Sequence, residues 1–138
     1  MADYKLTVAG LGPGDAGLIT RETWGRIEAA RHILLRTRIH PTVEALDAAG
    51  IRYETYDDFY EDAADFEELY ERIADDLMVR VKASDVLYLV PGSPFVAERT
   101  VQILRERAME EGASLEILPA MSFLEPLFAA LSLDPVNG

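Results

Sequence analysis

The chain has 138 residues, 49% of them apolar, which suits one domain with a buried core. It carries 25 acidic and 13 basic residues, a formal net charge of −12. This charge argues against a nucleic-acid backbone or an anionic membrane surface as the main partner. Without cysteine, the chain can form neither a disulfide nor a thiolate metal site.

The amino-terminal segment Met1–Lys5 lacks the charged-then-apolar pattern of a secretory signal. No apolar run in the sequence approaches the roughly 20 residues that are needed to span a bilayer. We therefore expect a cytoplasmic protein with neither a membrane nor a nucleic acid as partner.

The first half of the chain alternates short apolar runs with helical patterns. An apolar run enters the glycines at 10, 12 and 14, Thr20 is suited to cap a helix, and Pro41 is suited to the first turn of another. The predicted elements are a strand over residues 5–9, a helix over 21–30, a strand over 33–35, a helix over 41–50 and a strand over 51–56.

The second half contains the clearest amphipathic helix. Its apolar side chains recur at spacings of three and four residues, and the apolar run Val86–Val90 is typical of a central parallel strand. The predicted elements are a loop or ragged helix start over residues 57–65, a helix over 66–81, a strand over 86–90, a helix over 96–111, a strand over 115–118 and a helix over 123–131.

This alternation of strands and helices predicts an α/β fold. We expect three α/β/α layers around a mostly parallel sheet of about five strands. Open parallel sheets bind ligands at the carboxyl ends of their strands. A site is therefore expected among three loops that follow predicted strands, at residues 10–15, 91–94 and 119–123.

The first of these loops reads Gly-Leu-Gly-Pro-Gly-Asp. Its glycines allow the backbone to approach a ligand closely. The spacing matches neither the dinucleotide fingerprint nor a phosphate-binding P-loop, and Asp15 would repel a pyrophosphate. The loop favours a ligand without phosphates, or else it is an ordinary strand-to-helix turn.

The other two loops are equally open to interpretation. The segment Pro91–Pro94 exposes backbone groups between two prolines, with Val96 and Ala97 as a small apolar floor. Alternatively it is a plain turn in which Ser93 caps a helix. Ser122 would cap the last helix, and its hydroxyl could also point toward a ligand.

Together the three loops resemble the N-terminal domain of the tetrapyrrole (corrin/porphyrin) methylases. That family opens with Gly-x-Gly-Pro-Gly-Asp followed by Leu-x-Thr, matched here by residues 10–15 and 18–20. Its Gly-Asp-Pro loop is matched by Gly92–Pro94, with Ser in place of Asp, and its Pro-Gly-x-Ser loop by Pro119–Ser122. The resemblance extends over essentially the whole chain and implies that residues 1–138 are the N-terminal half of a two-domain unit.

The resemblance implies a methyltransferase whose cofactor, S-adenosylmethionine, lies between the two domains. A ligand without phosphates needs backbone hydrogen bonds and apolar walls, and an acidic protein tolerates its sulfonium cation. The protein mainly aligns the nucleophile with the methyl group. Carried over position by position, the cofactor contacts are Pro13, Pro91, Gly92, Ser93, Val96, Ser122 and Phe123.

One position departs from the family pattern. Members that methylate uroporphyrinogen carry a catalytic Asp at the end of the second strand, where this sequence has Arg36. A permanent cation thus replaces a group that could accept a proton, which argues against methylation of the usual tetrapyrrole. Arg36, Arg38 and His40 would instead meet an anionic group of a small-molecule substrate, or they are solvated loop residues.

Three segments are similar to the subgroup that is fused to a MazG-type nucleotide pyrophosphohydrolase: Arg36–Pro41, Phe59–Glu61 and Val90–Pro94. This implies a second methylase domain beyond Gly138 and a MazG domain after it. Residues 1–138 alone would then be inactive, and apolar surface left uncovered would let two copies pair. The alternative function is a non-catalytic module that senses a ligand or supports assembly of the attached pyrophosphohydrolase.

The amphipathic helix also carries a cluster of carboxylates that could hold Mg²⁺. We interpret it as a solvated face, because it lies opposite the apolar stripe. Neither histidine has a second histidine at metal-ligand spacing, so no metal site is expected. The carboxylates are Glu67, Glu68, Glu71, Asp75 and Asp76.

Overall fold

The computed structural model describes residues 4–136 as an α/β domain around one five-stranded sheet. The strand order is β3-β2-β4-β1-β5, and every neighbouring pair is parallel. The predicted fold class is confirmed. The strands are β1 Lys5–Gly10, β2 Ile33–Leu35, β3 Glu54–Thr55, β4 Val86–Val90 and β5 Ser114–Ile117.

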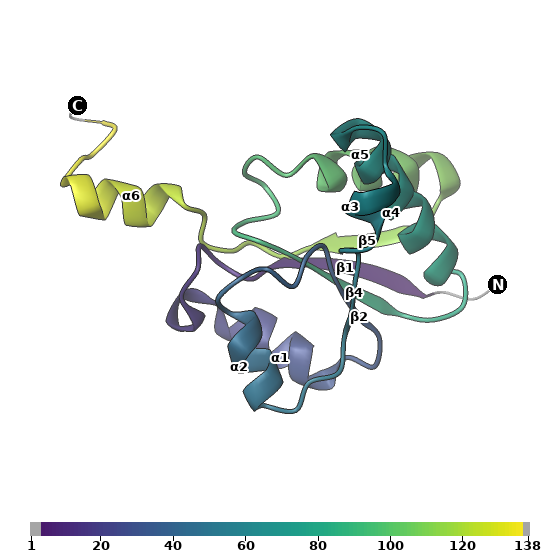
Figure 1. Ribbon diagram of the computed structural model, residues 1–138, viewed down its shortest axis with the longest axis horizontal. Coiled ribbons are helices and arrows are strands. Elements are labelled where there is room, and N and C mark those ends of the chain that lie inside the picture. Colours follow the sequence, from purple (N-terminus) through teal and green to yellow (C-terminus); the bar gives the residue numbers. More distant parts are fainter. Residues whose placement is uncertain (1–3, 137–138) are drawn as a thin grey trace.

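Helices cover both faces of the sheet (Figure 1). The helices α1 (Arg21–Ala29) and α2 (Val43–Ala48) lie on one face, and α3 (Phe59–Asp62), α4 (Phe66–Arg80) and α5 (Arg99–Glu111) lie on the other. Two apolar clusters fill the spaces between the sheet and these layers. Every residue of β4 is buried, as expected for a central strand whose two faces are both covered.

Helix α4 shows how the sequence builds this packing. The Asp65 side chain accepts a hydrogen bond from the Glu68 N–H and so caps the helix start. The apolar stripe buries Leu69, Ile73 and Leu77, each 1% exposed or less. Burial of each such side chain stabilises the fold by about 2 kcal/mol.

The acidic face of α4 meets three arginines, two from α5 and one from α4 itself. Glu67 pairs with Arg99, Asp75 pairs with Arg107, and the Asp76 carboxylate accepts from Arg80 at 2.6 Å. Glu68 accepts from the Ala64 N–H. The face that the sequence predicted as solvated is therefore partly engaged in ion pairs between neighbouring helices.

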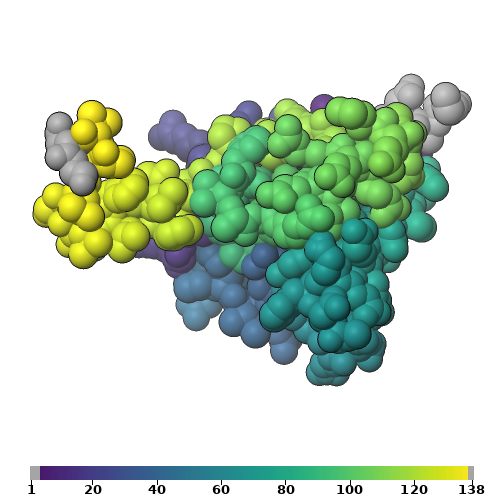
Figure 2. Space-filling view, turned by 90° about the horizontal axis from the view of Figure 1, so that it is seen from above, coloured from purple at the N-terminus to yellow at the C-terminus, as the bar shows by residue number. Residues whose placement is uncertain are grey.

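The remaining helical segments lie near the carboxyl ends of the strands. A single 3₁₀ turn, η1 (Ala16–Leu18), begins where the Asp15 side chain accepts from the Gly17 N–H at 2.7 Å. Helix α6 (Leu124–Leu131) extends away from the sheet, and none of its residues is buried (Figures 1 and 2). No helix among the described residues is both long and apolar enough to cross a membrane.

The boundaries of some predicted elements were wrong. Helix α5 begins at Arg99 rather than at residue 96, because Ala97 has a left-handed φ of 54° and Glu98 is extended. The strand predicted over residues 51–56 is reduced to Glu54–Thr55, an edge strand that pairs with β2 alone. A short helix, α3, lies within the predicted loop at 57–65.

Candidate functional site

The first two loops are joined directly by their glycines. The Gly92 N–H donates to the Gly12 carbonyl at 2.8 Å, and the Gly12 N–H donates to the Gly92 carbonyl at 3.2 Å. Both glycines have positive φ, 79° at Gly12 and 65° at Gly92, where other residues are strained. The pair of hydrogen bonds fixes the two loops to each other at the carboxyl ends of β1 and β4.

Gly10 is required for a different reason, which is close approach. A Cβ placed on Gly10 would lie 2.1 Å from the Gly92 carbonyl oxygen and 2.7 Å from the Ala120 Cβ. Any side chain at position 10 would therefore push apart all three loops. The glycines that the sequence pattern singled out thus hold the loops together.

His40 connects the segment after β2 to the same place. Its Nδ1 accepts from the Thr42 N–H at 3.1 Å, so Nε2 carries the proton and donates to the Gly12 carbonyl at 2.9 Å. Burial lowers the pKa of His40 below its ordinary value, although the hydrogen bond to Gly12 acts in the opposite direction. The imidazole is therefore neutral near pH 7 and serves as a strut.

Arg36 lies at the end of β2 and pairs with Glu98. The distance from Arg36 Nη1 to Glu98 Oε1 is 2.6 Å, and the Glu98 side chain is only 3% exposed. Burial works against the charged guanidinium, but the negative charge of Glu98 prevails and raises the pKa of Arg36 above its usual value. Arg36 is therefore part of a partly buried ion pair and is not a solvated loop residue.

A cavity of about 280 Å³ opens between these loops. All the predicted cofactor contacts line it, together with Arg36 and His40 from the predicted substrate group. Residues distant in sequence are thus gathered at one edge of the sheet. The lining residues are Gly12, Pro13, Arg36, His40, Pro91, Gly92, Ser93, Val96, Ala97, Glu98, Ser122 and Phe123.

Arg38 does not share this position. It is exposed and does not line the cavity. Its backbone N–H donates to the Asp57 carboxylate at 2.9 Å, and the Thr37 hydroxyl donates to the other oxygen of that carboxylate at 2.6 Å. Asp57 therefore holds the segment in place, while the Arg38 side chain is directed elsewhere.

Sequence reasoning missed Glu98, which lay inside a predicted helix. Its Oε2 accepts from the Thr100 hydroxyl at 2.8 Å, and that hydroxyl is also 3.1 Å from the buried Tyr88 hydroxyl. The sequence carried no usable local signal, since Glu is not among the residues preferred at the start of a helix. Its pairing with Arg36 spans 62 residues and has no local signature.

Ser122 was expected to cap the last helix, but the cap position of α6 is Phe123, and Ser122 precedes it. Its Oγ accepts from the Leu124 N–H at 3.1 Å and donates to Glu125 at 2.6 Å. Ser93 does not cap a helix either, because the cap residue of α5 is Glu98, and its Oγ accepts from the Phe95 N–H at 3.2 Å within the loop. Both serines therefore stabilise the loops that line the cavity.

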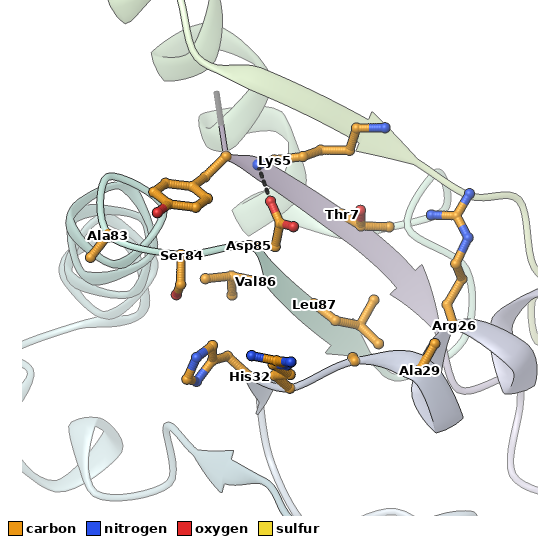
Figure 3. Close-up of a pocket in the computed structure, with 13 residues that line it drawn as sticks. Lys5, Thr7, Arg26, Ala29, His32, Ala83, Ser84, Asp85, Val86 and Leu87 are labelled. Carbon is orange, nitrogen blue, oxygen red and sulfur yellow. Dashed lines mark hydrogen bonds between the residues drawn. The ribbon is translucent and has the colours of Figure 1, made fainter. Parts of the chain in front are cut away.

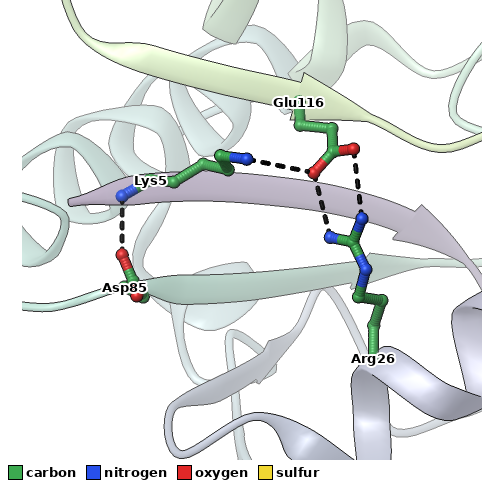
Figure 4. Close-up of polar contacts among 4 residues, drawn as sticks. All are labelled: Lys5, Arg26, Asp85 and Glu116. Atoms are coloured by element: carbon green, nitrogen blue, oxygen red, sulfur yellow. Dashed lines mark hydrogen bonds and ion pairs between the residues drawn. The ribbon is translucent and has the colours of Figure 1, made fainter. Parts of the chain in front are cut away.

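A larger hollow of about 680 Å³ lies at the opposite edge of the sheet, against the amino ends of β1 and β4 (Figure 3). Lys5, Arg26, Arg31 and His32 line it. Helix α1 ends here, and the carbonyls of a helix end attract cations. Glu116 accepts from Arg26 at 2.9 and 3.2 Å and from Lys5 at 3.5 Å (Figure 4).

Two of the basic side chains of that larger hollow, Lys5 and Arg26, are therefore paired with Glu116. Parallel sheets also bind ligands at the carboxyl ends of their strands, where the smaller cavity lies. We take the smaller cavity as the candidate site.

Comparison with known proteins agrees with this geometry. The family model described as Tetrapyrrole (Corrin/Porphyrin) Methylases matches residues 5–138. The uncharacterized protein YabN of Bacillus subtilis (strain 168) is 40% identical over 134 residues. That alignment covers 97% of this chain but only 27% of YabN, so the chain spans about a quarter of its relative.

Solved structures share the fold. A diphthine synthase superposes with a TM-score of 0.74 at 22% identity, over 94% of this chain and 49% of that one. The uroporphyrin-III-C-methyltransferase from Thermus thermophilus gives 0.72 at 21% identity, over 96% and 55%. A structure of the Thermus thermophilus enzyme complexed with S-adenyl homocysteine gives 0.64 at 20% identity, over 87% and 46%.

Proposed function

This chain belongs to the tetrapyrrole (corrin/porphyrin) methylase family, and on that basis we propose that it binds S-adenosylmethionine in the cavity between its three loops and serves in methyl transfer. The observation that carries the proposal is the gathering of every predicted cofactor contact, from separate loops, around one cavity. The cavity also lies at the carboxyl edge of the sheet, where this class of fold places ligands.

The lining chemistry suits a ligand without phosphates. Pro13, Val96 and Phe123 offer apolar walls, and Phe123 is 53% exposed beside the opening. The Ser93 hydroxyl accepts one hydrogen bond within its loop, which leaves its hydrogen free to donate to a ligand. Among the described lining residues Arg36 is the one permanent cation, and Glu98 already offsets its charge.

That compensation matters for a cationic sulfonium. An unpaired Arg36 would repel it, and the repulsion would be strong in a partly buried cleft. With Glu98 beside Arg36 and His40 held neutral, the cavity wall carries no net charge from these groups. When bound, S-adenosylmethionine supplies an electrophilic methyl group, and the residues of this chain orient the partners of the reaction.

The chain spans about half of the solved structures that it superposes on. We therefore propose that a second methylase domain beyond Gly138 completes the cleft in the whole protein. A cleft with one wall loses part of its contacts, so residues 1–138 alone would bind cofactor weakly and would not turn over. The acceptor would be a small molecule, a tetrapyrrole or another.

Calorimetric titration with S-adenosylhomocysteine tests the proposal. Millimolar ligand should give saturable heat with the folded chain, and Val96→Phe should abolish it by filling the cavity. The matched control is Val79→Phe on the exposed face of α4, which leaves the cavity unchanged. Absence of heat with a folded chain and with a longer protein containing both halves would overturn the proposal.

A second candidate is a non-catalytic module that senses a ligand or supports an attached MazG-type pyrophosphohydrolase. It is favoured by one observation, which is that the only described carboxylate lining the cavity, Glu98, is engaged by Arg36 and Thr100. Such a carboxylate is not free to accept a proton. A full-length protein that binds S-adenosylhomocysteine but methylates no tetrapyrrole, uroporphyrinogen III included, would support this candidate.

A further inference from the structure

The guanidinium of Arg36 is only partly used by the protein. Its Nη1 donates to Glu98 at 2.6 Å, whereas its buried Nε has no hydrogen-bond partner among the described residues. Within residues 4–136, Thr23 Oγ1 is the other buried side-chain atom without a partner. Leaving a buried charged donor unpaired costs more than leaving a neutral one unpaired, so the arrangement needs an explanation.

Buried residues next to Arg36 fix the orientation of its side chain. Glu98 is held by the Thr100 hydroxyl at 2.8 Å, and Tyr88 lies 3.1 Å from that hydroxyl, fully buried in β4. The Arg36 backbone N–H donates to the Leu89 carbonyl at 3.0 Å. The guanidinium is therefore presented to the cavity by a rigid support, with its side chain still 21% exposed.

A fixed guanidinium with unpaired N–H groups matches one kind of ligand group. The planar fork of Arg pairs with carboxylate or phosphate oxygens in two parallel hydrogen bonds. Glu98 occupies Nη1, which leaves the part of the guanidinium that is still exposed for a second oxyanion, while Nε stays buried. Neither Arg38, which lies outside the cavity, nor His40, whose ring nitrogens are both engaged, offers such donors there.

We propose that Arg36 is a specificity-determining residue that binds an oxyanion, carboxylate or phosphate, on the methyl acceptor, with Glu98 as the positioning residue that orients it. The proposal rests on the proposed function, because it assigns the acceptor side of the same cavity. The oxyanion of the acceptor takes the N–H donors of the guanidinium that Glu98 leaves free and that the cavity still exposes. An acceptor without such a group would leave these donors unpaired and be rejected.

The Arg36 Nε–H gives a direct readout in proton–nitrogen correlation spectra. Its signal is assigned as the one that disappears in Arg36→Lys. Sodium acetate and sodium phosphate are titrated separately at constant ionic strength, with sodium chloride as the salt control. We expect a saturable shift of this signal with at least one oxyanion, and the stronger of the two identifies the kind of group.

Arg38→Gln is the matched control. It removes the same charge from a side chain that lies two residues further along the chain and outside the cavity. Arg36→Gln should weaken oxyanion binding, followed in the variants at the backbone amide signals of Gly92 and Ser93, about tenfold or more through the loss of charge-assisted hydrogen bonds. Arg38→Gln should leave it nearly unchanged. Both variants alter partly or fully exposed side chains, and circular dichroism checks their folding.

Two results would overturn the inference. One is a Nε–H signal that neither oxyanion moves, and the other is an equal loss of binding in Arg36→Gln and Arg38→Gln, which would indicate general charge attraction. A parallel titration with S-adenosylhomocysteine separates the two proposals. Cofactor binding without an oxyanion effect removes only this inference, and an oxyanion effect without cofactor binding removes only the proposed function.

Discussion

Arg36 and Glu98 lie 62 residues apart in sequence and meet at 2.6 Å on the wall of the candidate cavity. Arg36 directly follows β2, and Glu98 is the cap residue of α5. The resemblance to the methylases places a catalytic Asp of some members at position 36. In this chain a cation stands there, and the carboxylate comes from a different element.

Removal of Glu98 should destabilise the fold strongly. Glu98→Ala leaves Arg36 partly buried without its counter-charge and also removes a helix cap, so we expect a loss of about 3 kcal/mol in the free energy of unfolding. Urea denaturation measures it. The control Glu67→Ala breaks an exposed pair with Arg99 and should change that free energy by less than about 1 kcal/mol.

The double variant Arg36→Met/Glu98→Leu extends the same test. Replacing a buried pair by apolar side chains of similar size is often close to neutral, so much of the loss in Glu98→Ala should be recovered. Equal losses in Glu98→Ala and Glu67→Ala would contradict the view that the Arg36–Glu98 pair is buried and coupled.

Gly10→Ala should disrupt the join between the loops. The added Cβ would lie 2.1 Å from the Gly92 carbonyl oxygen, which belongs to the backbone and cannot move alone. We expect a loss of several kcal/mol, about 3 or more, with weaker cofactor binding. The control is Gly25→Ala in α1, where a Cβ meets nothing within 4 Å and should stabilise the helix by about 1 kcal/mol.

His40 should make stability depend on pH. Because burial lowers its pKa in the folded state, the unfolded chain takes up a proton first as the pH falls. The free energy of unfolding should therefore decrease below about pH 6.5, the ordinary pKa of histidine. Urea denaturation at stepped pH measures this decrease, and His40→Gln should flatten it. An unchanged slope in His40→Gln would contradict the role of His40 as a neutral strut.

Periodicity in the sequence predicted the frame of the fold well. Two apolar patterns predicted which residues are buried: the run Val86–Val90 and the stripe of Leu69, Ile73 and Leu77. They could do so because burial on a strand or helix repeats at a fixed period. The glycine pattern at 10–14 likewise predicted a tight loop after a strand. Its specific need, close approach to Gly92, involves a residue about eighty positions away and required the structure.

The site was predictable in part, through the resemblance rather than through local pattern. Ser93, Val96 and Ser122 were named from motifs, and the structure places them around one cavity. Glu98 was missed because the segment from 96 to 98 was assigned to a helix. The left-handed Ala97 and the extended Glu98 turn that segment toward Arg36, and only the tertiary pairing explains why.

The central claim is that the cavity between the three loops binds the cofactor, and backbone amide shifts during a titration with S-adenosylhomocysteine test it most directly. We expect saturable shifts at Gly12, Gly92, Ser93 and Ser122, on the carboxyl edge of the sheet, and none at Lys5 or His32 on the opposite edge. Shifts confined to the Lys5–His32 hollow, or no shifts in a folded chain at millimolar ligand, would contradict the claim.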